Sequence, residues 1–359
     1  MNALGREVKK FIIKRKDSDA GEAGRALEEV RASLFNDVRT SEGAKLQQQR
    51  FCGPFVALSF NFLIAVGIIM VNKLVLGSRV GFDFPIFLTF IHYACSWFLM
   101  TVFNAFSLLP PSPPSKFSST RAPFSSLFAL GAVMSLSNGL ANVSLKHNSV
   151  GFYQMAKIAV TPTIVLTEFL SFGKRVSANK GLALTVVSIG VAVATVTDLQ
   201  FNFFGACIAM AWIIPSAINK ILWSNLQQQE NWTALALMWK TTPVTLLFLL
   251  ALMPSLDPPG VLSFNWDFSN TSAILISAAL GFLLQWSGAL ALGATSATTH
   301  VVLGQFKTCI ILLGGSLLFQ SDPGVMSICG AVGALCGMSV YTYLNLQKTT
   351  DAMTEAESV

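Results

Sequence analysis

Charged side chains are scarce in this 359-residue sequence: Asp, Glu, Lys and Arg make up 12% of it, whereas hydrophobic residues make up 53%. Soluble domains average about 25% charged residues, so this composition disfavours a soluble globule. The first 53 residues hold 11 of the 24 Lys and Arg residues and 8 of the 18 Asp and Glu residues. The sequence therefore predicts a charged tail before a membrane-embedded body. The net charge of +6 mostly reflects this tail and the loops rather than a nucleic-acid surface.

Residues that commonly bind metals or perform acid–base catalysis are also few. The three histidines (His92, His147 and His300) are scattered, and the six cysteines show no Cys-x-x-Cys spacing. The cysteines lie in or beside apolar runs, which indicates small core residues rather than disulfides or a metal site. We therefore expect no metal and no cofactor. A membrane-embedded transferase stays a distant alternative, because that chemistry usually needs a carboxylate or histidine base, or a metal.

Apolar runs near the roughly 20 residues that a helix needs to cross a bilayer recur behind the tail. Dividing the chain at its Pro, Gly, Asn, Asp and charge clusters predicts ten membrane spans, at about 54–76, 85–109, 124–143, 150–172, 179–197, 203–226, 233–253, 271–292, 296–319 and 324–345. The expected fold is an all-α integral membrane protein with one ten-helix domain over 54–346. Residues 1–53 and residues 347–359 are expected to be tails. In the first tail, the spacing of Leu27, Val30, Leu34 and Val38 predicts a short amphipathic helix.

Lys and Arg in the short loops predict the orientation in the membrane. With a cytosolic N-terminus, the cytosolic loops would carry five basic residues, namely Lys116, Arg121, Lys174, Arg175 and Lys180. The opposite side would carry only Arg79 and Lys146. Both termini are therefore expected to face the cytosol.

Short segments recur about 150 residues apart. Val71–Leu74 (VNKL) in the first span resembles Ile218–Ile221 (INKI) in the sixth, and Lys157 in the fourth span precedes Lys307 in the ninth by 150 residues. This spacing predicts two five-span halves, at about 54–197 and 203–346. Because five is odd, the second half enters from the opposite side of the membrane. Such inverted repeats are typical of transporters, whose binding sites lie near the midplane between the halves.

Five lysines lie within the predicted spans, where Glu168 is the one clear carboxylate. An uncompensated lysine in lipid costs about 3 kcal/mol even on lenient scales, so we expect these lysines to face water. The excess of cations predicts an anionic substrate, and lysine binds phosphate well as a point charge. Lysines near helix ends could instead extend to the headgroups. The five are Lys73, Lys157, Lys220, Lys240 and Lys307, of which Lys73 and Lys220 are nearest to helix ends.

Aromatic and amide side chains accompany these lysines. Aromatic rings can stack on a nucleobase and amides can recognise its polar edge, although helix packing is the alternative explanation for each residue. The candidates are Tyr153 and Gln154 before Lys157, Trp239 beside Lys240, Gln285 in the eighth span, and Gly304 and Gln305 before Lys307.

Several phrases together resemble one transporter family. They are Asn72-Lys73, Asn148–Met155 (NSVGFYQM), Ala194–Gln200 (ATVTDLQ) and Gly304–Thr308 (GQFKT). They resemble the nucleotide-sugar and triose-phosphate transporter branch of the drug/metabolite transporter superfamily, and within it the plant-type subgroup named for its Lys-Thr pair. The resemblance covers about residues 54–346.

The resemblance implies exchange of a cytosolic UDP-sugar for lumenal UMP, by alternating access, across the Golgi or endoplasmic-reticulum membrane. By this similarity Lys307 and Thr308 bind the phosphates and Lys220 faces them, while Tyr153, Gln154 and Lys157 line the cavity. The Asn-Lys pairs Asn72-Lys73 and Asn219-Lys220 are expected to contribute as well. Plastid sugar-phosphate exchangers of the same fold carry Lys-Arg at the Lys-Thr position and stay the alternative. Small-residue faces such as Gly330, Gly333 and Gly337 could pair two copies in a homodimer.

Overall fold

The structure is a computed structural model that describes residues 54–106, 109, 122–173, 176–196, 202–229, 232–294, 307–308, 311 and 324–357. Its regular elements over these residues are helices, so the predicted all-α class is confirmed there. The elements are α4 (Pro54–Leu76), α5 (Pro85–Ala105), α6 (Ala122–His147), α7 (Val150–Phe172), α8 (Ala178–Val196), α9 (Phe203–Gln229), α10 (Ala234–Leu256), the 3-10 turn η1 (Val261–Ser263), α11 (Phe268–Ala294) and α13 (Val325–Glu357). Residues 1–53 and most of the predicted span 296–319 lie outside the described residues.

Seven helices have the length and hydropathy to cross a membrane. These stretches are Leu58–Leu76, Pro85–Ala105, Phe124–His147, Phe203–Trp223, Ala234–Leu256, Phe268–Gly288 and Val325–Leu344. The chain is therefore a multi-pass membrane protein, as its composition predicted. Two further predicted spans are helical but do not meet the same criterion. The apolar stretch of α8, Ala178–Ala194, is shorter, and α7 carries Tyr153, Gln154, Lys157 and Glu168.

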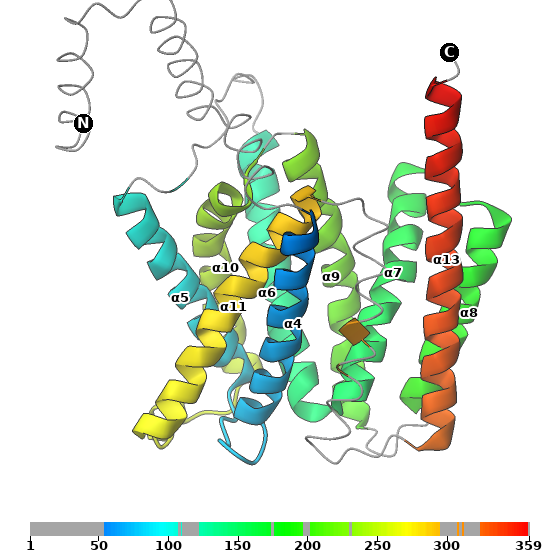
Figure 1. The fold of residues 1–359 in the computed structure, drawn as a ribbon. Coiled ribbons are helices and arrows are strands. Elements are labelled where there is room, and N and C mark those ends of the chain that lie inside the picture. The colour runs from blue at the N-terminus through cyan, green and yellow to red at the C-terminus, as the bar shows by residue number, and fades with distance from the viewer. Residues whose placement is uncertain are drawn as a thin grey trace, which may run out of the picture.

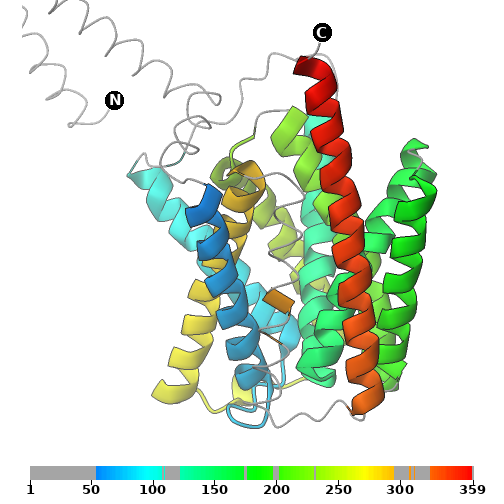
Figure 2. The ribbon, with the colours of Figure 1, turned by 45° about the vertical axis from the view of Figure 1, so that its right-hand side comes forward.

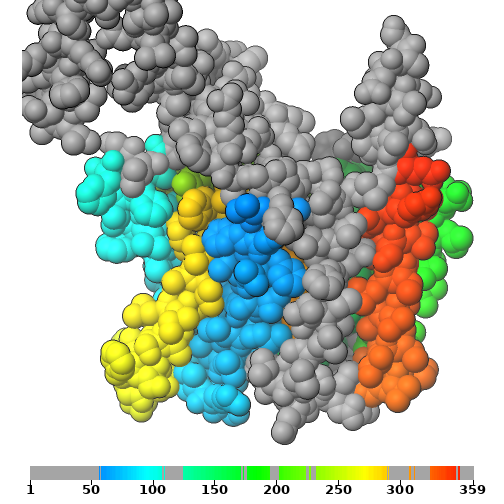
Figure 3. Space-filling model, viewed as in Figure 1, coloured from blue at the N-terminus to red at the C-terminus, as the bar shows by residue number. Residues whose placement is uncertain are grey.

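The helices of one predicted half pack against those of the other (Figures 1 and 2). Counted within each half, the first helix contacts the third helix of the opposite half: α4 packs on α11, and α9 packs on α6. The second helices, α5 and α10, contact each other, and so do the fifth, α8 and α13. Figure 3 shows α4 and α11 side by side on one face of the molecule, with α13 further along that face.

Glycines allow α8 and α13 to meet backbone to backbone. A Cβ atom on Gly190 would lie 2.5 Å from the amide nitrogen of Ala334, and one on Gly330 would lie 2.5 Å from that of Ala194. Small residues four apart permit this approach in membrane helices. The Ser327 hydroxyl also donates to the Ala194 carbonyl, at 2.7 Å.

This contact corrects the expectation that the glycine face of the last span pairs two copies. Gly330 lies against α8, and a Cβ on Gly337 would lie 3.0 Å from Val187 Cγ2 and 3.1 Å from the Ala183 carbonyl. Most of the face is therefore occupied within the chain. Gly333 differs, because a Cβ there would meet nothing within 4 Å.

Polar contacts join the end of the bundle where α4 ends and α5 begins. Lys146 forms an ion pair with Asp83 at 2.6 Å. The Asp257 carboxylate, just after α10, accepts hydrogen bonds from the amides of Ile86 at 2.9 Å and Phe87 at 2.7 Å. These amides are at the positive N-terminus of α5, where an anion is stabilising. Burial nevertheless raises the pKa of the Asp257 carboxyl, against the effect of the two amides.

Candidate functional site

Three of the five predicted lysines come together. Lys157 on α7, Lys220 on α9 and Lys307 are close enough for each ammonium group to repel the other two. Lys157 and Lys220 are exposed and Lys307 is partly exposed, although all three belong to the membrane body. Like charges that lie near one another repel, and a bound counter-charge relieves the repulsion. This lysine cluster (Lys157, Lys220 and Lys307) therefore favours a bound anion.

Local helix geometry positions Lys157. The Ser149 hydroxyl caps the N-terminus of α7 by accepting a hydrogen bond from the Phe152 amide at 3.0 Å. Tyr153 is then one turn before Lys157, and the ammonium group lies 5.2 Å from the centre of its ring. Tyr153 in turn packs against Trp212 of α9, with ring centres 5.8 Å apart. The lysine cluster thus has an aromatic wall.

Buried polar atoms without partners among the described residues lie on the helices α7, α9 and α11. Four of the seven such side-chain atoms are Gln154 Nε2, Trp212 Nε1, Asn219 Oδ1 and Gln285 Oε1. Gln154 is 1% exposed and Trp212 is 2% exposed. Burying an unpaired polar group costs about 1–3 kcal/mol, so such groups usually have a ligand or water to bind. Three of the four residues are predicted site residues, and Trp212 was not foreseen.

Lys307 is held by residues that the sequence analysis missed. Its ammonium group donates to Asn61 Oδ1 of α4 at 2.9 Å, and Asn61 Nδ2 donates to the Ser287 hydroxyl of α11 at 3.2 Å. Asn61 is 3% exposed and Ser287 is fully buried. The signal available in the sequence was a second amide, besides Asn72, within the mostly apolar first span.

The segment around Lys307 is partly described. Thr308 is buried, and Ile311 is fully buried in a core shared by α4, α6, α7 and α9. Lys307 and Thr308 are therefore adjacent to the helices that carry the other two lysines. The predicted site residues Gly304 and Gln305 lie outside the described part of the chain.

Lys73 is placed away from the lysine cluster. Its ammonium group donates to the carbonyls of Leu145 at 2.8 Å and Asn148 at 2.6 Å, with Lys146 at 3.5 Å. These carbonyls are at the C-terminal end of α6 and the turn into α7, where a cation is favoured. In this structure Lys73 therefore joins α4 to the α6–α7 turn.

Asn72 belongs to a buried network that links four helices. Its Nδ2 donates to Asn142 Oδ1 of α6 at 3.1 Å, and its Oδ1 accepts from the Ser277 hydroxyl of α11 at 2.5 Å. Ser277 also contacts His92 Nε2 at 2.8 Å, and Asn142 Nδ2 donates to Thr89 Oγ1 at 2.9 Å. His92 and Thr89 are both on α5. Because the Ser277 proton goes to Asn72, His92 Nε2 is the donor to Ser277. Both polar groups of the Asn72 amide are thus satisfied by protein.

Lys240 and Trp239 are on α10, which packs against α5, α6 and, less closely, α11. Lys240 is exposed, and Trp239 stacks on Trp97 of α5 with ring centres 6.1 Å apart. The structure therefore does not bring these two predicted residues to the lysine cluster.

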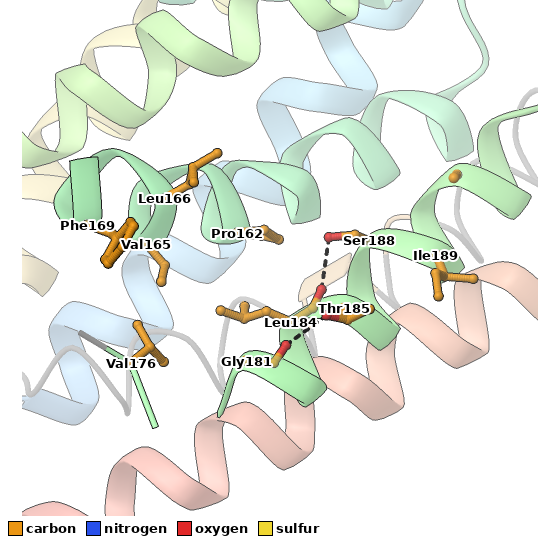
Figure 4. Close-up of a pocket in the computed structure, with 11 residues that line it drawn as sticks. Pro162, Val165, Leu166, Phe169, Val176, Gly181, Leu184, Thr185, Ser188 and Ile189 are labelled. Atoms are coloured by element: carbon orange, nitrogen blue, oxygen red, sulfur yellow. Dashed lines mark hydrogen bonds between the residues drawn. The ribbon is translucent and has the colours of Figure 1, made fainter. Parts of the chain in front are cut away.

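An apolar hollow of about 750 Å³ lies elsewhere, between α7 and α8 (Figure 4). Its wall includes Pro162, Leu166, Phe169, Leu184 and Ile189. The Thr185 and Ser188 hydroxyls in it donate to carbonyls of their own helix, at 3.0 and 2.9 Å. The hollow has no lysine in its lining, so it lacks the chemistry to bind an anion.

Comparison with known proteins identifies the class. Residues 55–342 match the Triose-phosphate Transporter family, and the chain belongs to this family. The protein is a membrane transporter, so the transferase alternative is wrong.

Relatives from Arabidopsis thaliana extend the match along almost the whole chain. Nucleotide-sugar uncharacterized transporter 2 is 73% identical over 99% of this chain and 88% of its own length. UDP-xylose transporter 3 is 32% identical, covering 84% of this chain and 82% of its own. UDP-rhamnose/UDP-galactose transporter 2 is also 32% identical, covering 80% and 82%. The predicted family resemblance is confirmed.

The fold is also similar to that of a solved crystal structure. It superposes with a TM-score of 0.52 at 12% sequence identity, and the match covers 79% of this chain and 98% of that one. At this identity the similarity concerns the fold alone.

Proposed function

We propose that this protein exchanges a cytosolic UDP-sugar for lumenal UMP. The observation that carries the proposal is the cluster of three mutually repelling lysines from distant parts of the chain. Relatives that are named UDP-xylose and UDP-rhamnose/UDP-galactose transporters support a UDP-sugar as the anion. A diphosphate supplies negative charge in one compact group, which suits three point charges.

In this proposal the two ends of the nucleotide contact different groups. Lys307, Thr308 and Lys220 bind the phosphates, and Lys157 lies next to them above the Tyr153 ring. The base is recognised by the aromatic pair Tyr153 and Trp212 together with the amides of Gln154, Asn219 and Gln285, each of which has one buried atom without a partner among the described residues. Aromatic rings supply stacking, and amides both donate and accept hydrogen bonds.

Charge repulsion explains why transport would be an exchange. An empty lysine cluster resists closure, because closing removes water from three cations at once. A bound nucleotide neutralises the cations and lets the site close toward either side of the membrane. The carrier would therefore cross rapidly only when loaded.

Alternating access would use two inverted halves. The reciprocal packing of α4 with α11 and of α9 with α6 supports this arrangement, since exchanging the halves converts one pair into the other. The start of α4 and the end of α13 lie on the same side of the bundle (Figure 1), as an even number of crossings requires. We propose ten spans, with both termini cytosolic, in the Golgi membrane.

Reconstituted protein tests the substrate assignment. Proteoliposomes preloaded with UMP, GMP, CMP or inorganic phosphate are assayed for uptake of labelled UDP-xylose, UDP-galactose, UDP-rhamnose, UDP-N-acetylglucosamine and GDP-mannose. The proposal predicts uptake of at least one UDP-sugar that depends on internal UMP. Exchange only with GMP or phosphate would overturn the uridine assignment.

A further inference from the structure

Lys307 has a neutral partner. Its ammonium group donates to the amide oxygen of Asn61 at 2.9 Å, while its charged neighbours Lys157 and Lys220 only repel it. Asn61 is on α4 and is 3% exposed, so its amide is shielded from bulk water. A hydrogen bond that a cation donates to a buried amide oxygen is stronger than one at the surface. This bond can therefore fix the ammonium position without neutralising its charge.

Ser287 on α11 determines which end of the Asn61 amide meets Lys307. The Ser287 hydroxyl donates its proton to the Leu284 carbonyl at 3.2 Å. It can then only accept from Asn61, and Asn61 Nδ2 is 3.2 Å from it. With its NH2 group engaged there, Asn61 presents its oxygen to the lysine. A reversed amide would place an NH2 group against an ammonium group, where neither could accept a proton.

We propose that Asn61 is a positioning residue: it holds the Lys307 ammonium group where the anionic substrate binds. Ser287 fixes the orientation of the Asn61 amide. This role of Asn61 rests on the proposed function, in which Lys307 binds the anion. The charge must stay available to the substrate, and an amide achieves this because it accepts a hydrogen bond but carries no charge. The contact also connects the α4–α11 pair to the lysine cluster.

A double-mutant cycle separates positioning from a general effect on the fold. Full-length protein in detergent is titrated with UMP, GMP, CMP and inorganic phosphate, and the Kd is measured from the thermal shift. The variants are Asn61→Leu, Lys307→Ala and the two combined. Asn61→Leu should raise the Kd of the binding anion about tenfold. If Asn61 acts through Lys307, the combined variant should bind no more weakly than Lys307→Ala alone.

Two further variants serve as controls. One tests whether loss of any buried amide changes binding, and the other tests the orientation of the Asn61 amide. Asn142→Leu removes another buried amide, in the Asn72 network, and should lower the melting temperature while leaving the Kd unchanged. Ser287→Ala should raise the Kd less than Asn61→Leu, because the amide keeps its oxygen but loses its fixed orientation. If Asn61→Leu does not fold, Asn61→Ala and Ser287→Ala carry the same test.

The outcomes distinguish this proposal from the proposed function. An unchanged Kd for Asn61→Leu, or a fully additive loss in the combined variant, overturns the role of Asn61 and leaves UMP binding intact. A coupled loss with GMP or phosphate, but no UMP binding, supports the role of Asn61 and overturns the uridine assignment. Absence of binding by all four anions to the unsubstituted protein contradicts both.

Discussion

The five lysines of the membrane spans have very different surroundings. Lys157, Lys220 and Lys307 repel one another, whereas Lys73 donates to backbone carbonyls and Lys240 is exposed on α10. In the sequence each is a cation in an apolar run, and position sets apart Lys73 and Lys220, which are nearest to helix ends. The fold shows which of them come together.

Lys307→Ala should raise the Kd for the nucleotide strongly while leaving it measurable, and Lys240→Ala should leave it unchanged. The first removes a cation from the lysine cluster, together with its bond to Asn61. The second removes a cation of the same type from α10, which packs mainly against α5 and α6. Binding of UMP by both variants, at matched amounts of folded protein, is the measurement. A comparable loss in Lys240→Ala would show that the site extends to α10.

Lys73→Met should lower stability and spare binding. It leaves the Leu145 and Asn148 carbonyls without their charged donor, at a cost of about 1–3 kcal/mol. The melting temperature in detergent should fall, and the Kd for UMP should stay near that of the unsubstituted protein. A raised Kd at unchanged melting temperature would instead return Lys73 to the substrate site, as the sequence analysis expected.

The repeat in the sequence singled out three lysines that come together in the structure and two residues that lie elsewhere. The pairing of Lys157 with Lys307 and the recurrence of Lys220 identified residues that do come together. The same pattern included Asn72 and Lys73, whose contacts are with α6 and its turn, as well as α11. Asn61 and Ser287 were missed, because an amide or hydroxyl in an apolar span gives no charge signal.

At the level of helices, hydropathy predicted the elements well and their partners poorly. α4 and α7 begin and end where the apolar runs do, because each run is bounded by turn residues or charges. α6 ends four residues later than predicted, and α13 continues to Glu357, well beyond its apolar part. An apolar run fixes where a helix lies but not which face meets which neighbour. The glycine face of α13 therefore appeared free for a second copy, whereas it contacts α8.

The α8–α13 contact gives a test at this level. Gly190→Leu or Gly330→Leu places a side chain where a Cβ atom already lies 2.5 Å from backbone nitrogen. Backbone cannot yield as a flexible side chain does, so each variant should lose at least about 2 kcal/mol of stability. Thermal unfolding and size-exclusion profiles in detergent measure this loss.

Gly333→Leu is the matched control on the same helix, because a Cβ there meets nothing within 4 Å. It should behave like the unsubstituted protein. Equal damage from Gly333→Leu would indicate that this face is also covered, for example by another subunit.

At the scale of the whole molecule, helices from distant parts of the chain pack reciprocally and contribute to one lysine cluster. In the proposed arrangement of two halves, α4 with α11 and α9 with α6 are equivalent contacts, and the lysine cluster draws on both proposed halves through Lys157 and Lys220. A site shared in this way changes whenever the halves move relative to each other. Substrate charge and conformational change are thereby coupled.

Uptake of a labelled UDP-sugar into proteoliposomes, with and without internal UMP, tests that coupling most directly. The account predicts fast uptake into UMP-loaded vesicles, at most slow uptake into empty vesicles, and no uptake with Lys307→Ala in either. Uptake into empty vesicles as fast as into loaded ones would contradict it. The transporter with an empty lysine cluster would then switch between its two open sides without hindrance.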